Sequence, residues 1–182
     1  CFMTLQNVFK FIRLHRFEVL SIGLISLLAF VLRAWRISEY LTFLGDEGRD
    51  VRIVRDLLHG NLVFIGPMTS IGNMYLGPLY YYLMAPALWL SRLDPTGPAV
   101  MVALLSTLTI VFTWWVGRTW FSSLVGILAA LLFAISPVAI IYGRASWNPN
   151  PMPFFSLLCV WSICQVWKHH HFFWLIIAGT SL

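Results

Sequence analysis

The chain contains few charged residues and few cysteines. Only 10% of its 182 residues are Asp, Glu, Lys or Arg, and seven of these are acidic. Two of the three cysteines, Cys159 and Cys164, lie five residues apart within one apolar run, a spacing that puts them on different faces of a helix. We therefore expect neither a disulfide nor a cysteine pair that ligates a metal.

The chain also lacks a concentrated basic patch. Its formal net charge is +5, but the basic residues are scattered at the ends of apolar runs rather than gathered on one face. A protein that binds nucleic acid carries clustered basic residues. We therefore expect no nucleic-acid partner.

Apolar residues are abundant instead. They make up 59% of the chain, and the mean hydropathy is +0.81, whereas soluble domains are roughly 45–50% apolar. Runs of about 17–25 apolar residues can cross a membrane as helices. The runs lie at 19–35, 76–93, 99–117, 121–142, 153–167 and 172–182, the last too short to cross. The composition predicts an all-α integral membrane protein, a multi-span helical bundle.

The start of the chain suggests both its orientation and its extent. Lys10, Arg13 and Arg16 precede the first run, which by the positive-inside rule places the N-terminus in the cytoplasm and the loop 36–75 outside. No small-residue cleavage site follows the run, so we interpret it as an uncleaved anchor. Because the chain starts at Cys1 rather than Met, we interpret 1–182 as the N-terminal part of one transmembrane domain of a multi-pass cell-membrane protein.

The outer loop opens with a cluster of charge, Gly45-Asp46-Glu47-Gly48-Arg49-Asp50. Apolar residues then recur at helical spacing as far as His59, which predicts an amphipathic helix lying in the membrane interface with its apolar face toward lipid. Asp46 falls at the start of this helix, where it could serve as the N-cap, and Glu47 would suit the helix dipole. Catalysis is the alternative role for both carboxylates, and the two roles can coexist.

A segment rich in glycine, proline and tyrosine closes the outer loop. It ends with Gly77-Pro78-Leu79-Tyr80-Tyr81-Tyr82. Tyrosines at this place are typical of an aromatic belt at the membrane surface. They could equally form the wall of a site that receives the headgroup of a lipid-linked substrate.

The order of these features resembles the membrane glycosyltransferases of the GT-C fold. The motifs that carry the resemblance are the Asp46-Glu47 pair, the amphipathic helix after it, Gly-Pro-Leu-Tyr-Tyr, Ser136-Pro137 and the segment Tyr142-Gly143-Arg144-Ala145-Ser146-Trp147-Asn148. The resemblance is greatest to the group of protein mannosyltransferases, aminoarabinose transferases and Rgt-like bacterial sugar transferases. It implies transfer of a sugar from a polyprenyl-phosphate-linked donor to an acceptor protein, lipid or glycan on the extracytoplasmic side.

The resemblance also implies roles for particular residues. It makes Asp46 the general base that deprotonates the acceptor hydroxyl, with Glu47 in support, and it sets Arg49 or Arg144 against the leaving phosphate. The candidate substrate-binding residues are Arg49, Asp50, Tyr80, Tyr81, Arg144 and Asn148. Related proteins often carry a second acid in the later loop, where this chain has Asn148 and Asn150. This difference argues against a second catalytic acid there.

Other interpretations of the same residues stay open at this point. Asp46, Glu47 and Asp50 could help to ligate a divalent metal through oxygen, although ion pairing with Arg49 and Arg52 explains them equally well. A transporter or lipid flippase fragment also carries charge within broken apolar segments. In a non-catalytic membrane scaffold, Asp46 would only cap a helix.

The number of crossings decides whether the two loops can share a site. Three apolar runs separate the outer loop from Arg144 and Asn148. If all three cross, those residues lie on the opposite side from Asp46. The run 76–93 is the shortest of the three and contains Pro78 and Pro86, so it is the best candidate to be re-entrant.

Overall fold

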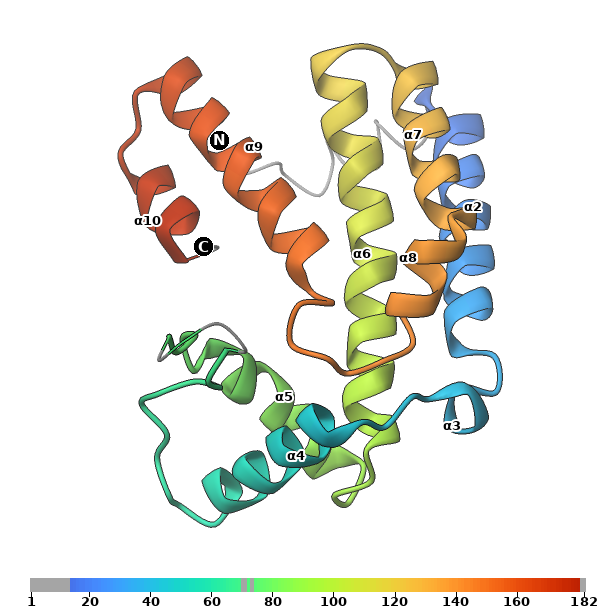
Figure 1. Cartoon of the computed structure of the whole chain (residues 1–182). Coiled ribbons are helices and arrows are strands. Elements are labelled where there is room, and N and C mark those ends of the chain that lie inside the picture. The colour runs from blue at the N-terminus through green and yellow to red at the C-terminus, as the bar shows by residue number, and fades with distance from the viewer. Residues whose placement is uncertain (1–13, 70–71, 73, 181–182) are drawn as a thin grey trace.

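A computed structural model describes residues 14–69, 72 and 74–180 of the chain. Within this part the secondary structure is helical, apart from a single antiparallel bridge between Met68 and Tyr75. The helices labelled in Figure 1 are α2 (Arg16–Ala34), α3 (Ile37–Tyr40), α4 (Gly45–Leu58), α5 (Leu79–Leu90), α6 (Thr96–Trp120), α7 (Ser123–Ile135), α8 (Pro137–Tyr142), α9 (Met152–His169) and α10 (Phe173–Thr180). The predicted all-α class is confirmed.

Helices α2, α6 and α7 form a three-helix bundle (Figure 1). Small residues allow close packing at its centre, where Ala29, Ala130 and Ala134 are fully buried beside Ile110. In the described part of the chain, α2 and α6 are the helices long and apolar enough to cross a membrane, each with a mean hydropathy of 2.0. At about 1.5 Å per residue, the 25 residues of α6 extend over roughly 38 Å.

The run 121–142, predicted as one span, is divided between two helices. The first, α7, ends at Ile135, and α8 begins at Pro137. Proline has no N–H to continue a helix and its ring collides with the carbonyl four residues earlier. The Ser136 hydroxyl accepts from the Ala139 N–H at 3.4 Å and caps the new helix.

Helices α4 and α5 lie across one end of the bundle (Figure 1). The amphipathic helix expected after Asp46 is present as α4, and Gly60, at φ +99°, follows its end. Part of its apolar face packs against α5, because Val54 is fully buried in a cluster with Tyr81, Met84 and Leu88.

Helix α9 leads away from this end of the bundle and α10 returns along it (Figure 1). The two helices pack through aromatic rings, with Trp161 and Trp174 centroids 4.9 Å apart. Cys159 and Cys164 of α9 are both free thiols. Lys10 and Arg13, on which the predicted orientation depends, lie outside the described residues.

The connection from α8 to α9 lies at the same end of the bundle as α4 and α5. The hydroxyl of Tyr80 on α5 donates to the main-chain carbonyl of Ser146 in this connection. Helix α5 has 12 residues, which at about 1.5 Å per residue extend over roughly 18 Å, less than a bilayer core of about 30 Å. The main-chain N–H of Ser146 also contacts the Glu47 carboxyl of α4, so the first loop and the connection after α8 meet.

Candidate active site

The start of α4 is organised around Glu47. Leu44 holds the N-cap position in an extended conformation, and its N–H donates to Glu47 Oε2 at 2.7 Å. The prediction that Asp46 could be the N-cap is therefore wrong, because Asp46 lies in the first turn. Both acidic residues lie at the positive end of the helix dipole, as expected for Glu47.

Arg49 joins two carboxylates of α4. Its Nε and Nη2 donate to Asp50 Oδ1 at 3.1 and 3.0 Å, and its Nη1 donates to Asp46 Oδ1 at 3.0 Å. Asp50 is fully buried, whereas the Asp46 side chain is 56% exposed. A buried anion thus fixes the guanidinium, and the guanidinium fixes the direction of the exposed carboxylate.

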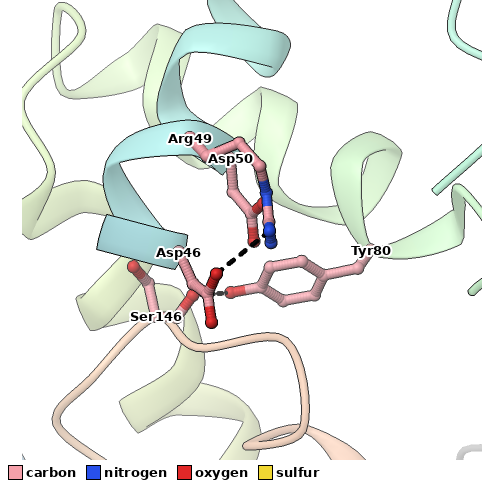
Figure 2. Close-up of polar contacts among 5 residues, drawn as sticks. All are labelled: Asp46, Arg49, Asp50, Tyr80 and Ser146. Carbon is pink, nitrogen blue, oxygen red and sulfur yellow. Dashed lines mark hydrogen bonds and ion pairs between the residues drawn. The ribbon is translucent and has the colours of Figure 1, made fainter. Parts of the chain in front are cut away.

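Side chains from three segments converge around Asp46 (Figure 2). Asp46 and Arg49 extend from α4, Tyr80 extends toward them from α5, and Ser146 lies on the connection after α8. The Tyr80 hydroxyl donates to the Ser146 carbonyl. The neighbouring Tyr81 is buried, and its hydroxyl lies near Asp50 without a hydrogen bond of normal geometry.

Several buried polar atoms around Glu47 and Asp50 have no hydrogen-bond partner of normal geometry in the described part of the chain. Within the described residues, the buried atoms here without a hydrogen-bond partner are Glu47 Oε1, Asp50 Oδ2, the Tyr81 hydroxyl and Ser146 Oγ. Folded proteins leave few buried polar groups unsatisfied, and those that remain often mark a functional site. In this structure the four atoms are enclosed by one another, with the Tyr81 hydroxyl beside the Asp50 carboxyl and the Ser146 main chain beside the Glu47 carboxyl.

Burial changes the acidity of two carboxyls in the cluster. It raises the pKa of Glu47 above its usual value, and the main-chain N–H groups of Leu44 and Ser146 offset only part of that rise. Burial also raises the pKa of Asp50, although the hydrogen bond and charge of Arg49 oppose it. Perturbed carboxyls in one cluster are typical of catalytic and binding sites.

The structure does not bring all the predicted site residues together. Asp46, Glu47, Arg49, Asp50, Tyr80 and Tyr81 belong to the cluster. The Arg144 guanidinium instead donates to the Leu32 carbonyl at the end of α2, with Nε at 3.0 Å, and lies over the ring of Tyr40 at 5.2 Å. Asn148 lines an adjacent cleft.

That cleft has a volume of about 370 Å³ and lies between α5, the connection after α8 and α9. Tyr80 forms part of its wall, so the cleft adjoins the polar cluster. Its other lining residues are mostly apolar and include Leu83, Met152 and Phe155. Tyr80 therefore belongs both to the polar cluster and to the wall of the cleft.

The suggested metal site at Asp46, Glu47 and Asp50 is not formed by these side chains. No group of three or more His, Cys, Asp or Glu residues in the described part of the chain is placed to hold a metal ion. Asp50 Oδ1 and Asp46 Oδ1 are both bound by Arg49, and Glu47 Oε2 is bound by the Leu44 N–H.

Ser146 and Arg33 are not among the residues that the sequence predicted for the site. Ser146 is 1% exposed and reaches the cluster through its main chain, for which the sequence carried no signal. Arg33 is 0% exposed near the end of α2. A charged residue inside an apolar run is a signal of structural or functional importance, and it could have drawn attention to Arg33.

The fold and the cluster define a helical membrane protein with an acidic and aromatic site at one end of its bundle. A family model described as dolichyl-phosphate-mannose-protein mannosyltransferase matches residues 75–182, more than half of the chain. The chain therefore belongs to this family and is a membrane glycosyltransferase of the mannosyltransferase kind. The match includes Tyr80, Arg144 and Asn148, and begins after α4. A search of curated proteins found no match.

Proposed function

We propose that this protein transfers a sugar from a polyprenyl-phosphate-linked donor to a hydroxyl acceptor on the extracytoplasmic side of the cell membrane. One observation carries the proposal: the exposed Asp46 carboxylate is held in place by Arg49, which the buried Asp50 fixes in turn. Membership of the family supports a lipid-linked donor and a protein acceptor. Lipid and glycan acceptors fit the same chemistry.

In the proposed step, Asp46 takes the proton of the acceptor hydroxyl. The acceptor oxygen then forms a bond to the anomeric carbon of the sugar, while the bond from that carbon to the phosphate oxygen breaks. The leaving group is the polyprenyl phosphate, whose oxygen keeps the electron pair of the broken bond. Arg49 would stabilise its charge, because the guanidinium is 37% exposed while it holds the two aspartates.

The other residues of the cluster have supporting roles in this proposal. The buried Asp50 would support the base by holding Arg49 against Asp46, and the buried Glu47 would hold the start of α4 through the Leu44 N–H. The apolar cleft beside Tyr80 would hold the first isoprene units of the carrier, with Asn148 near the phosphate. An amphipathic donor requires this combination of a polar cluster and an adjoining apolar surface.

A transfer assay in lipid vesicles tests the proposal. The substrates are polyprenyl-phosphate mannose and an acceptor peptide that contains Ser and Thr, and nucleotide-linked mannose serves as the alternative donor. We expect Asp46→Asn to lower transfer from the lipid-linked donor by about 10²–10⁴-fold, the usual contribution of a general base. Asp56→Asn is the matched control, because Asp56 is a half-exposed aspartate of α4 that pairs with Arg55 at 3.3 Å.

The proposed donor would be wrong if the wild-type protein used the nucleotide-linked sugar and left the lipid-linked sugar unreacted. The proposed base would be wrong if Asp46→Asn retained the activity of the Asp56→Asn control.

A further inference from the structure

Arg33 is a buried cation whose partners are not acids. Its Nε donates to the Ser106 hydroxyl of α6 at 2.8 Å, and its Nη1 donates to the Ala29 carbonyl of α2 at 3.1 Å. No carboxylate in the described part of the chain lies within ion-pair distance of it. The partly buried Arg118, at the other end of the bundle, pairs with Glu18 at 2.8 Å. Arg33 therefore requires an explanation other than charge pairing.

The remaining partners of Arg33 are the carbonyls released by the break between α7 and α8. Pro137 has no N–H for the Phe133 carbonyl, and the end of α7 at Ile135 leaves the Ala134 carbonyl without its helical partner. Arg33 Nη2 donates to Phe133 O at 3.3 Å, and Nη1 donates to Ala134 O at 3.1 Å. A carbonyl without a hydrogen bond costs free energy in apolar surroundings. Because Arg33 donates to both carbonyls, the break between α7 and α8 avoids this cost.

The break then directs the chain toward the polar cluster. Helix α8 ends at Tyr142, and the following Gly143 lies against Arg33, where an added Cβ would be 3.0 Å from Arg33 Nε. The next residue, Arg144, donates to the Leu32 carbonyl of α2. Two residues later, the Ser146 carbonyl accepts from Tyr80 beside Glu47. Arg33 thus binds the end of α7 to α2, and Arg144 binds the start of this connection to α2.

We propose that Arg33 is a positioning residue that stabilises the α7–α8 break and thereby holds the connection 143–151 against α4 and α5. Its effect on sugar transfer would rest on the proposed function. Its effect on the position of Ser146 depends only on the contacts of Arg33, so the two can be tested separately.

Thiol labelling of Ser146→Cys reports the position of the connection without any assay of transfer. Ser146 is 1% exposed and its Oγ has no partner, so cysteine replaces it with little change. The three native cysteines are replaced by alanine, and the full chain in detergent is treated with a water-soluble maleimide. We expect Arg33→Met to increase the labelling rate by at least about tenfold, because local opening exposes the thiol.

Two further variants give this experiment its controls. Arg118→Met also removes a partly buried arginine bound to α2, but at the far end of the bundle, and should leave the labelling rate within about twofold of the parent protein. Arg33→Lys should label at an intermediate rate, because one ammonium lacks the planar fork that reaches all four acceptors. An unchanged rate in Arg33→Met, or an equal increase in Arg118→Met, would overturn the proposal.

A double-mutant cycle keeps the proposal testable if Arg33→Met folds poorly. Pro137→Ala returns a main-chain N–H that can serve the Phe133 carbonyl, so part of the need for Arg33 is removed. The yield of monodisperse folded protein is measured with and without Arg33→Met in two backgrounds, the wild type and Pro137→Ala. We expect Arg33→Met to lower the yield less in the Pro137→Ala background. Equal losses in the two backgrounds would show that Arg33 does not act through these carbonyls.

Discussion

At the residue scale, Arg49 shows how an exposed carboxylate keeps a fixed direction. A surface ion pair such as Arg49–Asp46 is usually worth about 0–1 kcal/mol and holds its partners loosely. Here the guanidinium also makes two bonds to the buried Asp50, which restrict its orientation. Asp46 can therefore be both accessible and oriented, the combination that a general base needs.

The sequence predicted the identity of the residues in this cluster better than it predicted their geometry. The acidic run and the tyrosines drew attention to Asp46, Glu47 and Tyr80 because charge and polar groups are rare in the chain. It could not predict that Arg144 would bind the Leu32 carbonyl. That contact joins residues 112 positions apart and depends on how the helices pack.

Glu47→Gln should change the dependence of stability on pH. The raised pKa of Glu47 means that ionising it costs folding free energy, so its favourable contribution is present at low pH and is lost as the pH rises from the ordinary carboxyl value through the raised one. Gln cannot ionise, but its oxygen can still accept from the Leu44 N–H. The Tm of the variant relative to wild type should rise through this window and then level off, measured in detergent from about pH 4 to 8.

The same pH series on Asp56→Asn provides the control for this prediction. A Glu47→Gln difference in Tm that stays constant over the whole pH range would contradict it, because an unperturbed or unimportant carboxyl would produce that result.

Tyr80→Phe should destabilise the protein more than Tyr82→Phe does. Removing the Tyr80 hydroxyl leaves the Ser146 carbonyl without this donor, and such an orphan costs about 1–3 kcal/mol when buried. The Tyr82 hydroxyl also donates to a main-chain carbonyl, that of Val63 at 2.9 Å, but at an exposed place where water can substitute. Chemical denaturation of both variants in detergent measures the difference, and equal losses would contradict this role for Tyr80.

At the element scale, hydropathy located most helices but not their breaks or their partners. The runs at 19–35 and 99–117 correspond to α2 and α6, because apolar residues continue through both helices. The run at 121–142 is equally apolar on both sides of Pro137, so hydropathy alone did not divide it. The pairing of α4 with α5 was not predicted because an amphipathic face does not specify what covers it.

Gly126→Ala should destabilise the crossing of α6 and α7. A Cβ at Gly126 would lie 2.5 Å from the Trp114 carbonyl and 2.8 Å from the Arg118 N, both main-chain atoms that cannot move aside independently. Overpacking of this kind typically costs about 1–3 kcal/mol. Gly23→Ala in α2 is the matched control, because nothing lies within 4 Å of its Cβ, and it should be neutral or slightly stabilising. Similar Tm values for the two variants would contradict the close crossing.

At the scale of the whole molecule, both parts of the proposed site lie at one end of the bundle (Figure 1). Helix α2 leads to α4, and α8 leads to the connection 143–151, while α9 ends at the far end with Lys168 and His169 in its last turn. The short α5, with 12 residues, lies across the same end. This arrangement allows Asp46 and Ser146 to face the same compartment.

Cysteine labelling in sealed vesicles should show this sidedness. The half-exposed Asp56 on α4 and the exposed Trp147 on the connection after α8 should react from the same side, and the exposed His171 after α9 should react from the opposite side. Each is changed to cysteine singly, and an impermeant maleimide is added before or after the membrane is opened. Reaction of positions 56 and 147 from opposite sides would contradict the shared site.

The most direct test of the central claim is the rate of one transfer event with the donor already bound. Polyprenyl-phosphate mannose is loaded onto wild type, Asp46→Asn and Asp56→Asn at matched occupancy, and an acceptor peptide then starts a single turnover. We predict that Asp46→Asn retains the donor but slows the transfer step by at least about 10²-fold, while Asp56→Asn behaves as wild type. A transfer step of wild-type rate in Asp46→Asn would contradict the assignment of Asp46 as the base.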